Sequence, residues 1–202
     1  MIMRIIDISR DIFEAEVYPG DPEPRLQRVE RMEEGDDCNL CALYFGLHNG
    51  THIDAPRHFI EDGITAEELD LNRFIGECLV LEAPEGPING DFIDENVPED
   101  CERLIIKGNG KAYFSQSGAF AAASTNLKLV GTDSNSVGTQ GAQLAPHRAF
   151  LGADIPLLEG LDLEKVTPGK YFLVALPMKF SGVEATPTRA ILISDFVFWG
   201  KA

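Results

Sequence analysis

Short apolar runs recur along the chain, and each is bounded by glycine, proline, aspartate or asparagine. Runs of about 4–8 residues, rich in β-branched and aliphatic side chains and limited by such turn-forming residues, are typical of β-strands. Several of the runs have apolar residues on both alternating faces, so they predict central strands that are covered on both faces. The predicted strands span residues 4–8, 78–82, 103–107, 127–130, 171–176 and 190–193.

Helix signals are fewer than strand signals. Thr65 and Glu68 have the spacing of a capping box, in which each residue satisfies a free N–H at the start of a helix. Residues 117–124 are rich in alanine, and Asn126 is placed to end a helix there. Because no internal repeat or linker interrupts the pattern, we predict one strand-rich α/β domain that covers residues 1–202.

Composition and charge narrow the class of protein. The chain has 202 residues, of which 44% are hydrophobic, and 33 acidic residues against 17 lysines and arginines give a net charge of −16. Such an acidic surface repels phosphate backbones and anionic lipid, so we expect a small-molecule substrate rather than nucleic acid or a membrane. The sequence contains neither a signal-peptide pattern nor an apolar run long enough to span a membrane, so we expect a cytoplasmic protein.

The four cysteines fit a reducing compartment, where they are expected to be free thiols. Cys38 and Cys41 have the spacing of a redox pair or of half a zinc site, but the sequence has no second such pair to complete a four-cysteine site. Both belong to an apolar, strand-like run that extends over residues 38–45. We therefore predict that they are buried, structural thiols.

One segment concentrates the side chains that bind metals. His48, His52 and His58, three of the four histidines, lie within eleven residues, and Asp54 lies among them. Imidazole and carboxylate groups bind zinc and neighbouring divalent metals. Histidines in a surface loop are the plain alternative, but three of them together with an aspartate favour a metal site.

The spacing in this segment also has a geometric meaning. Asn49-Gly50 and Pro56 make a continuous helix unfavourable, which excludes the helical metalloprotease arrangement. On an extended path, His52 and Asp54 project to the same face, and a turn at Asn49-Gly50 can bring His48 back beside them. Three converging donors with a fourth residue nearby favour a catalytic site, since structural zinc sites normally close with four protein ligands.

The local sequence pattern alone does not decide the roles of two further residues and one loop. His147 follows Ala145-Pro146, and Glu159 follows two leucines, so each could equally be a ligand or a residue at the edge of the core. Residues 131–138 lack the lysine and the glycine spacing of a phosphate-binding loop. We interpret them as a turn after the preceding strand that lines the site.

The segment from His48 to Phe59, His-x-Gly-Thr-His-x-Asp-x-Pro-x-His-Phe, resembles the signature of the Putative cyclase family. This family includes bacterial kynurenine formamidases (arylformamidases) and isatin hydrolases. Weaker similarities follow in the same order along nearly the whole chain, at residues 6–9, 18–21, 74–76, 131–133, 158–161, 175–177 and 188–190.

The resemblance implies a swivelling β/β/α fold, usually in a homodimer or homotetramer, with one or two divalent ions. Zinc is the first expectation and manganese the second. By position, His48, His52 and Asp54 bind the first ion, and Asp54 is able to bridge to the second. His147 and Glu159 then complete the second site.

The motif and the resemblance together predict hydrolysis of an amide or cyclic amide by metal-activated water, with His58 as the proton donor and acceptor. The leading reaction is conversion of N-formylkynurenine to kynurenine and formate. Tyr18, Phe45 and Phe59 are expected to form an aromatic substrate-binding wall. Tyr18 stands where the family's formamidases tend to have tryptophan, and Arg57 is charged within the motif. Both departures leave the metal chemistry intact, but they leave the identity of the substrate undecided.

Three other functions are compatible with the same histidine cluster. The first is isatin hydrolase-like activity, and the second is cyclase or dehydratase activity on another small aromatic or carboxylic substrate. The third is a metal-binding or redox module that does no hydrolysis and uses the histidine cluster with Cys38 and Cys41. Replacement of both cysteines with serine separates this module from a hydrolase.

Overall fold

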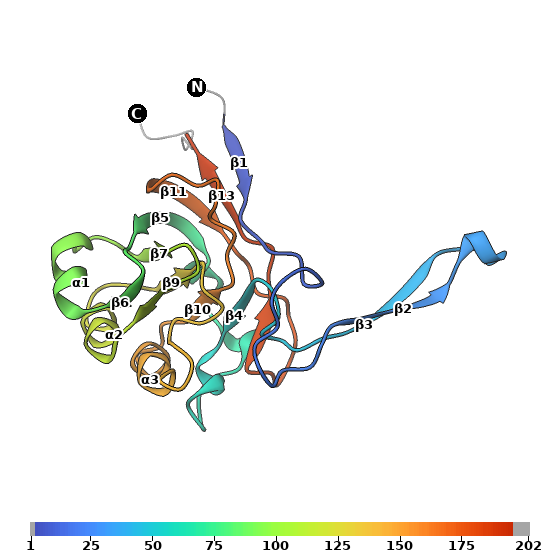
Figure 1. Cartoon of the computed structure of the whole chain (residues 1–202), viewed down its shortest axis with the longest axis horizontal. Coiled ribbons are helices and arrows are strands. Elements are labelled where there is room, and N and C mark those ends of the chain that lie inside the picture. The colour runs from blue at the N-terminus through green and yellow to red at the C-terminus, as the bar shows by residue number, and fades with distance from the viewer. Residues whose placement is uncertain (1–2, 196–202) are drawn as a thin grey trace.

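A nine-stranded curled sheet forms the centre of the protein, which we describe from a computed structural model over residues 3–195 (Figure 1). The four strands β5, β7, β9 and β10 are parallel to their neighbours within this group, and the flanking strands pair antiparallel. In order across the sheet the strands are β1 (Arg4–Asp7), β13 (Ile191–Ser194), β11 (Gly169–Val174), β5 (Ile75–Glu82), β7 (Arg103–Lys107), β9 (Leu129–Thr132), β10 (Leu157–Glu159), β4 (His52–Asp54) and β12 (Ala185–Pro187).

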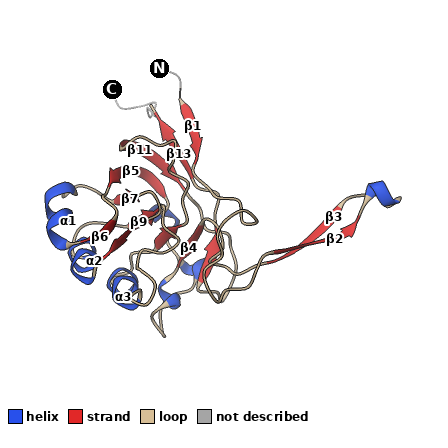
Figure 2. Cartoon of the chain, in the orientation of Figure 1, coloured by secondary structure: helices blue, strands red, loops and turns tan. Residues whose placement is uncertain are grey.

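The α-helices gather on one face of the sheet, over its parallel strands (Figure 2). They are α1 (Gly90–Asn96), α2 (Gln116–Ala123) and α3 (Leu144–Gly152), accompanied by the short parallel pair β6 (Gly86–Ile88) and β8 (Ala112–Phe114). Single 3₁₀ turns cover Met32–Glu34, Pro56–His58, Ala66–Glu68 and Leu71–Arg73. Among the residues that the structure describes, no helix has the length and apolar character needed to cross a membrane.

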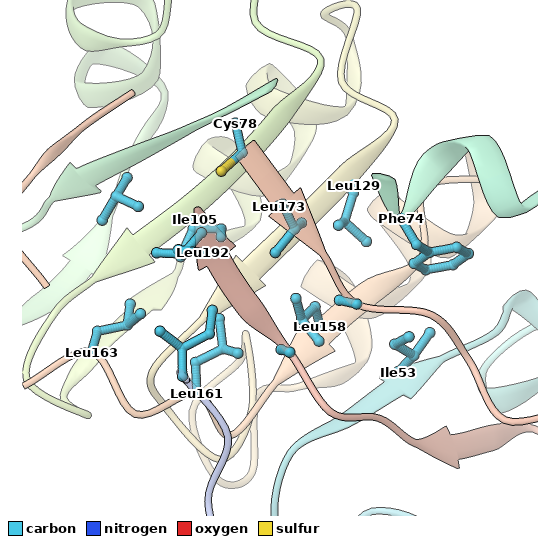
Figure 3. Close-up of a cluster of buried hydrophobic side chains, with 14 of the residues drawn as sticks. Ile53, Phe74, Cys78, Ile105, Leu129, Leu158, Leu161, Leu163, Leu173 and Leu192 are labelled. Atoms are coloured by element: carbon cyan, nitrogen blue, oxygen red, sulfur yellow. The ribbon is translucent and has the colours of Figure 1, made fainter. Parts of the chain in front are cut away.

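Two hydrophobic cores lie on opposite faces of the sheet. In β7, Leu104 and Ile106 belong to the core beneath the helices, whereas Ile105 belongs to the core on the other face. This alternation follows from the period of two along a strand. Figure 3 shows the second core, in which Ile53 and Leu158 pack among other buried aliphatic side chains.

The predicted strand-rich α/β fold is confirmed. Each of the six predicted strands overlaps a strand of the main sheet, and every residue of β9 is buried, as two-sided covering requires. The predicted alanine-rich helix is α2, which begins after Ser115, whose hydroxyl accepts a hydrogen bond from the N–H of Gly118 at 3.2 Å. At the predicted capping box, Glu68 accepts from the N–H of Thr65 at 2.9 Å, but the helix is only one 3₁₀ turn.

The prediction that Cys38 and Cys41 are buried is wrong, since both are exposed. Cys41 lies on β3 (Leu40–Tyr44), which pairs with β2 (Arg25–Glu30) in a two-stranded hairpin. We call residues 25–44 the arm, because the hairpin projects away from the rest of the protein (Figure 1). The apolar run does form a strand, but every residue of β3 is exposed, and no second layer from residues 3–195 covers it.

Candidate metal centre

Strand β4 places the first two predicted ligands side by side. His52, Ile53 and Asp54 are all buried, and Ile53 points into the core on one face of the sheet. Because side chains alternate along a strand, His52 and Asp54 point to the other face. β10 pairs antiparallel with β4 and puts Glu159 directly opposite His52. Backbone register therefore brings a second carboxylate to the pair that the motif predicts.

His48 reaches the same face through a turn, as the spacing predicts. The N–H of Asn49 donates to the carbonyl of Gly46 at 3.1 Å, and Gly50 has a φ of 66°, which a residue without a side chain adopts without strain. The turn brings His48 Nδ1 to 2.9 Å from Oδ1 of Asp54. His48 is therefore the third group at this face.

The turn and the β10 segment approach closely at Gly160. Gly160 has a φ of 68°, and a Cβ atom there would lie 2.2 Å from the carbonyl oxygen of Gly50. The hydroxyl of Thr51 donates to the Gly160 carbonyl at 2.6 Å. Only glycine fits at this position, and the close contact fixes Glu159 relative to the histidine segment.

His58 lies at the end of the 3₁₀ turn Pro56–His58, for which Pro56 supplies a preset φ at the first position. Its ring centroid is 4.2 Å from that of His48 and 5.7 Å from that of His147. The side chain is half-buried, in contrast to the fully buried His52 and His147. His58 therefore lies at the accessible side of the cluster.

Helix α3 covers the cluster and contributes His147. Pro146 falls in the first turn of this helix, where its missing N–H costs no hydrogen bond. The ring of Phe59 stacks on His147, with a centroid distance of 4.3 Å and an interplanar angle of 27°. His147 Nε2 then lies 3.5 Å from Oε1 of Glu159 and 3.8 Å from Oδ2 of Asp54.

The donor atoms form two groups that share Asp54. One group contains His48, Asp54 and His58, and the other contains His52, Asp54 and Glu159, with the donor atoms of each group within 4.8 Å of one another. His52 Nε2 lies 3.4 Å from Asp54 and 3.5 Å from Glu159. A carboxylate common to both groups has the position expected of a ligand that bridges two ions.

Three atoms of the cluster are buried without a hydrogen-bond partner among the described residues: His52 Nε2 and both carboxylate oxygens of Asp54. The close approach of His48 to Asp54 lacks the angles of a hydrogen bond. Buried polar atoms left unpaired cost about 1–3 kcal/mol each, and more when charged. A divalent cation would satisfy all three, so the residues present fit a metal.

Two of the histidines are held so that Nε2 faces the cluster. Nδ1 of His52 lies 3.1 Å from the carbonyl oxygen of Gly50, and Nδ1 of His147 lies 2.8 Å from that of Gln143. Because a carbonyl oxygen only accepts, each Nδ1 carries the proton in the neutral ring. Nε2 is then free to donate its lone pair to a metal.

The charges of the cluster depend on one another. Burial opposes protonation of His48, but Asp54 outweighs it and raises the pKa of His48 to about 10. Burial also opposes ionisation of Asp54, yet the neighbouring imidazoles, His48 first, hold its pKa below the usual value. Burial lowers the pKa of His58 despite the nearby Asp54. His58 is therefore neutral near pH 7, in the form that accepts a proton.

Burial likewise opposes charge on His147 and Glu159. At His147, contact with Glu159 outweighs the effect of burial and raises the pKa of that imidazole. At Glu159 the repulsion by Asp54 acts in the same direction as burial, but contacts with His147 and His52 lower the pKa below its usual value. Both carboxylates of the cluster are thus ionised, as metal ligands have to be.

The predicted aromatic residues are placed differently from one another. Phe59 packs against the cluster, with its ring centroid 4.4 Å from that of His58. Tyr18 is half-buried, and its hydroxyl accepts a hydrogen bond from Nε2 of Gln143 at 2.7 Å, which ties it to the start of α3. Phe45 is half-buried at the base of the arm, and no ring contact joins it to the cluster within residues 3–195.

Sequence reasoning did not assign individual roles to three residues at the site. Gln143 holds His147 through its carbonyl, and the N–H of Val137 donates to Oε1 of Glu159 at 2.7 Å. The loop of residues 131–138 thus reaches the site, as expected. Glu184 lies 3.5 Å from His48 Nε2 through its Oε1. No local pattern marks these residues, because each joins the site through tertiary contacts.

Comparisons with known proteins show similarity to one family over most of the chain. The sequence profile described as Putative cyclase matches residues 6–139. The kynurenine formamidase of Erythrobacter litoralis (strain HTCC2594) is 35% identical over 209 residues, which covers 94% of this chain and 93% of that protein. A solved structure described as a potential metal-dependent hydrolase with cyclase activity has a TM-score of 0.84 at 26% identity, covering 97% of this chain and 100% of that chain. Isatin hydrolase A from Labrenzia aggregata shares the fold, with a TM-score of 0.81 at 19% identity over 95% of this chain and 93% of that chain.

Proposed function

Because the chain belongs to the Putative cyclase family, we propose that it is a metal-dependent hydrolase of an amide or cyclic amide C–N bond, with residues 1–202 as one enzymatic domain. The observation that carries this proposal is the buried cluster in which Asp54 joins two groups of donors and keeps both oxygens unpartnered. Such a cluster is unfavourable without a cation and fits one well.

We propose His48, His52 and Asp54 as ligands of a first ion, and His147 and Glu159 as the further ligands of a second. The sharing of Asp54 between both groups of donors supports a bridging role for its carboxylate. Zinc fits this set of imidazoles and carboxylates, and manganese is the alternative metal. The second ion depends on Glu159, which Val137 and the strand pairing hold in place.

When bound, a divalent metal lowers the pKa of water to about 7 and polarises the substrate carbonyl. His58 lies at the accessible side of the cluster in its neutral form, so its ring accepts the proton of the attacking water. It then delivers that proton to the nitrogen of the breaking C–N bond. Phe59 packs against His58 and His147 and limits the access of bulk water.

N-formylkynurenine is the proposed leading substrate, since a kynurenine formamidase is among the similar proteins. In this reaction, water adds its oxygen to the formyl carbon and the C–N bond breaks. The aniline nitrogen takes up a proton, so the products are kynurenine and formate. We propose Tyr18, Phe45 and Phe59 as the aromatic wall for the substrate ring, with Phe59 the best supported by its position.

A substrate panel tests the proposed reaction class. Purified protein loaded with zinc or manganese is assayed on N-formylkynurenine and on isatin, beside a variant with both Cys38→Ser and Cys41→Ser. We expect hydrolysis of N-formylkynurenine at equal rates in the two proteins, since both cysteines lie on the exposed arm. Hydrolysis of isatin alone would replace the substrate but keep the class. No hydrolysis of any substrate by either metal-loaded protein would support the non-hydrolytic metal-binding or redox module instead.

We further propose that the protein is a cytoplasmic homodimer or homotetramer whose interface includes the arm. The four cysteines are free, as a reducing compartment requires. An isolated two-stranded hairpin is at best marginally stable in water, so the arm needs a covering layer. Its exposed large apolar side chains are Leu26, Val29, Met32, Leu40, Leu43 and Tyr44. A second copy of the chain would remove them from water.

Sedimentation velocity tests the proposed interface. Leu26 and Leu43 face each other across the hairpin, so changing both to glutamate places two like charges near the base of the arm. We expect wild type to sediment as a dimer or tetramer and the Leu26→Glu, Leu43→Glu variant as a monomer. Leu71→Glu, at an exposed site outside the arm, is the matched control. A monomeric wild type, or an arm variant that assembles normally, contradicts the proposed interface.

A further inference from the structure

Glu184 is held beside the metal cluster by the backbone rather than by its own side chain. The N–H of Ala55 donates to the carbonyl of Glu184 at 2.9 Å, and the next residue, Ala185, pairs with Asp54 across β12 and β4. On the other side, the N–H of Ala66 donates to the carbonyl of Val183 at 2.9 Å. The position of Glu184 relative to Asp54 is therefore set by the edge of the main sheet.

The carboxylate of Glu184 faces the second nitrogen of His48. Nδ1 of this ring lies 2.9 Å from Asp54, and Nε2 lies 3.5 Å from Oε1 of Glu184. The imidazole is thus held between two carboxylates, one fully buried and one 41% exposed. In metal sites, a ligand histidine usually donates its other N–H to a carboxylate or a carbonyl, which fixes the ring and makes it a stronger donor.

The three proposed histidine ligands differ in this second partner. His52 and His147 each face a backbone carbonyl, at 3.1 and 2.8 Å respectively. His48 faces a carboxylate, which carries a full negative charge and strengthens a hydrogen bond from the ring. His48 therefore differs from His52 and His147 in that its second nitrogen faces a charged group rather than a backbone carbonyl.

We infer that Glu184 is a positioning residue that holds the His48 ring and tightens the binding of the first metal ion. With its Nε2–H directed at Glu184, whose Oε1 lies 3.5 Å away, the His48 ring would present the lone pair of Nδ1 to Asp54 and the ion. The inference rests on the proposed function only in placing a divalent ion at His48. It assigns to Glu184 no contact with substrate.

The affinity for zinc, measured by competition with a chromophoric chelator and without substrate, tests this role. Removal of a second partner of a ligand histidine weakens metal binding by about 10–100-fold, and we expect this loss in Glu184→Ala. Glu184→Gln keeps an acceptor oxygen of the same shape but loses the charge, so its affinity should lie between wild type and Glu184→Ala. Glu61→Ala, which removes an exposed acid from the segment after His58, should bind as wild type does.

A double-mutant cycle shows whether Glu184 acts through His48. In the His48→Ala background, Glu184→Ala should cause no further loss of zinc affinity, because the ring that it holds is absent. An equal further loss would mean that the carboxylate attracts the ion only by its charge, which overturns the inference. Thermal unfolding of the metal-free variants checks that all are folded.

The remaining outcomes separate this inference from the proposed function. If wild type binds zinc and Glu184→Ala binds it equally well, the positioning role is wrong and the hydrolase proposal stands. If Glu184→Ala keeps its zinc affinity but has a higher KM, Glu184 contacts the substrate instead. If wild type binds no zinc at the cluster, the proposed function itself fails.

Discussion

His52 and Glu159 face each other across the antiparallel strands β4 and β10, and Nε2 of His52 lies 3.5 Å from Oε2 of Glu159. The other oxygen of Glu159 accepts the N–H of Val137 at 2.7 Å, so the carboxylate is oriented from both sides. A spacing set by strand register varies less than one set by flexible loops. The proposed metal chemistry is thus built on a rigid part of the fold, as a preorganised site requires.

Asp54→Asn should remove most of the stabilisation of the protein by metal. At about 100 times its Kd, a bound ion stabilises the folded state by about 2.7 kcal/mol, or about 5–10 °C in Tm for a chain of this size. Asp54 belongs to both groups of donors, so its loss should remove most of this shift. Thermal unfolding with and without zinc measures it. Asp94→Asn, at an exposed position on α1, should keep the full shift. An unchanged shift in Asp54→Asn would exclude this carboxylate as a shared ligand.

His58→Ala should keep the metal and lose the activity. A positioned general acid–base contributes about 10²–10⁴-fold to the rate, so kcat should fall by this factor. Elemental analysis checks the metal content of the same sample. Arg57→Ala alters the neighbouring exposed residue and should retain wild-type kcat. Full activity in His58→Ala would remove this residue from the proposed mechanism, and loss of metal would make it a ligand.

Tyr18→Phe should weaken substrate binding without changing metal content. The phenol accepts a hydrogen bond from Gln143 at 2.7 Å, and the loss of such a bond costs about 1 kcal/mol, or about fivefold in an equilibrium constant. We therefore expect a rise of this size in KM, measured by steady-state kinetics. Tyr113→Phe, on β8, should leave KM at its wild-type value. A normal KM in Tyr18→Phe would show that the hydrogen bond between Tyr18 and the start of α3 does not contribute to substrate binding.

Thiol reagents should modify Cys41 and Cys38 before Cys78. Burial raises the pKa of Cys78 to about 12, whereas Cys41 is exposed on the arm. Cys38 should react more slowly than Cys41, because its thiol donates to Glu30 at 2.8 Å and this hydrogen bond raises its pKa. A short pulse of iodoacetamide followed by peptide mass spectrometry gives the order. Early modification of Cys78 would contradict the burial described for it.

The parts of the fold that the sequence predicts are those with a local cause. The run over residues 103–107 is apolar at successive positions because β7 contacts a core on each face. The pair His52 and Asp54 was also predictable, since alternation along an extended segment and a turn at Gly50 are local properties. These two observations were enough to place three donors on one face.

The remaining parts depend on contacts between distant segments. The strand β10 has only three residues, and nothing in Leu157-Leu158-Glu159 shows that Glu159 pairs with His52. Helix α3 has only a weak apolar face and a proline in its first turn, so its pattern does not mark His147 as a ligand. The arm has the same apolar pattern as a core strand, because periodicity does not show whether another layer covers it.

Under the proposed function, hydrolysis requires an ion held at Asp54 and its neighbouring histidines. The most direct test is the rate of kynurenine formation from N-formylkynurenine by metal-stripped protein as zinc is added back. We predict negligible activity without metal, recovery on addition of zinc, and no recovery in Asp54→Asn. Full activity of the stripped protein, or no activity when the cluster is loaded, would contradict the claim.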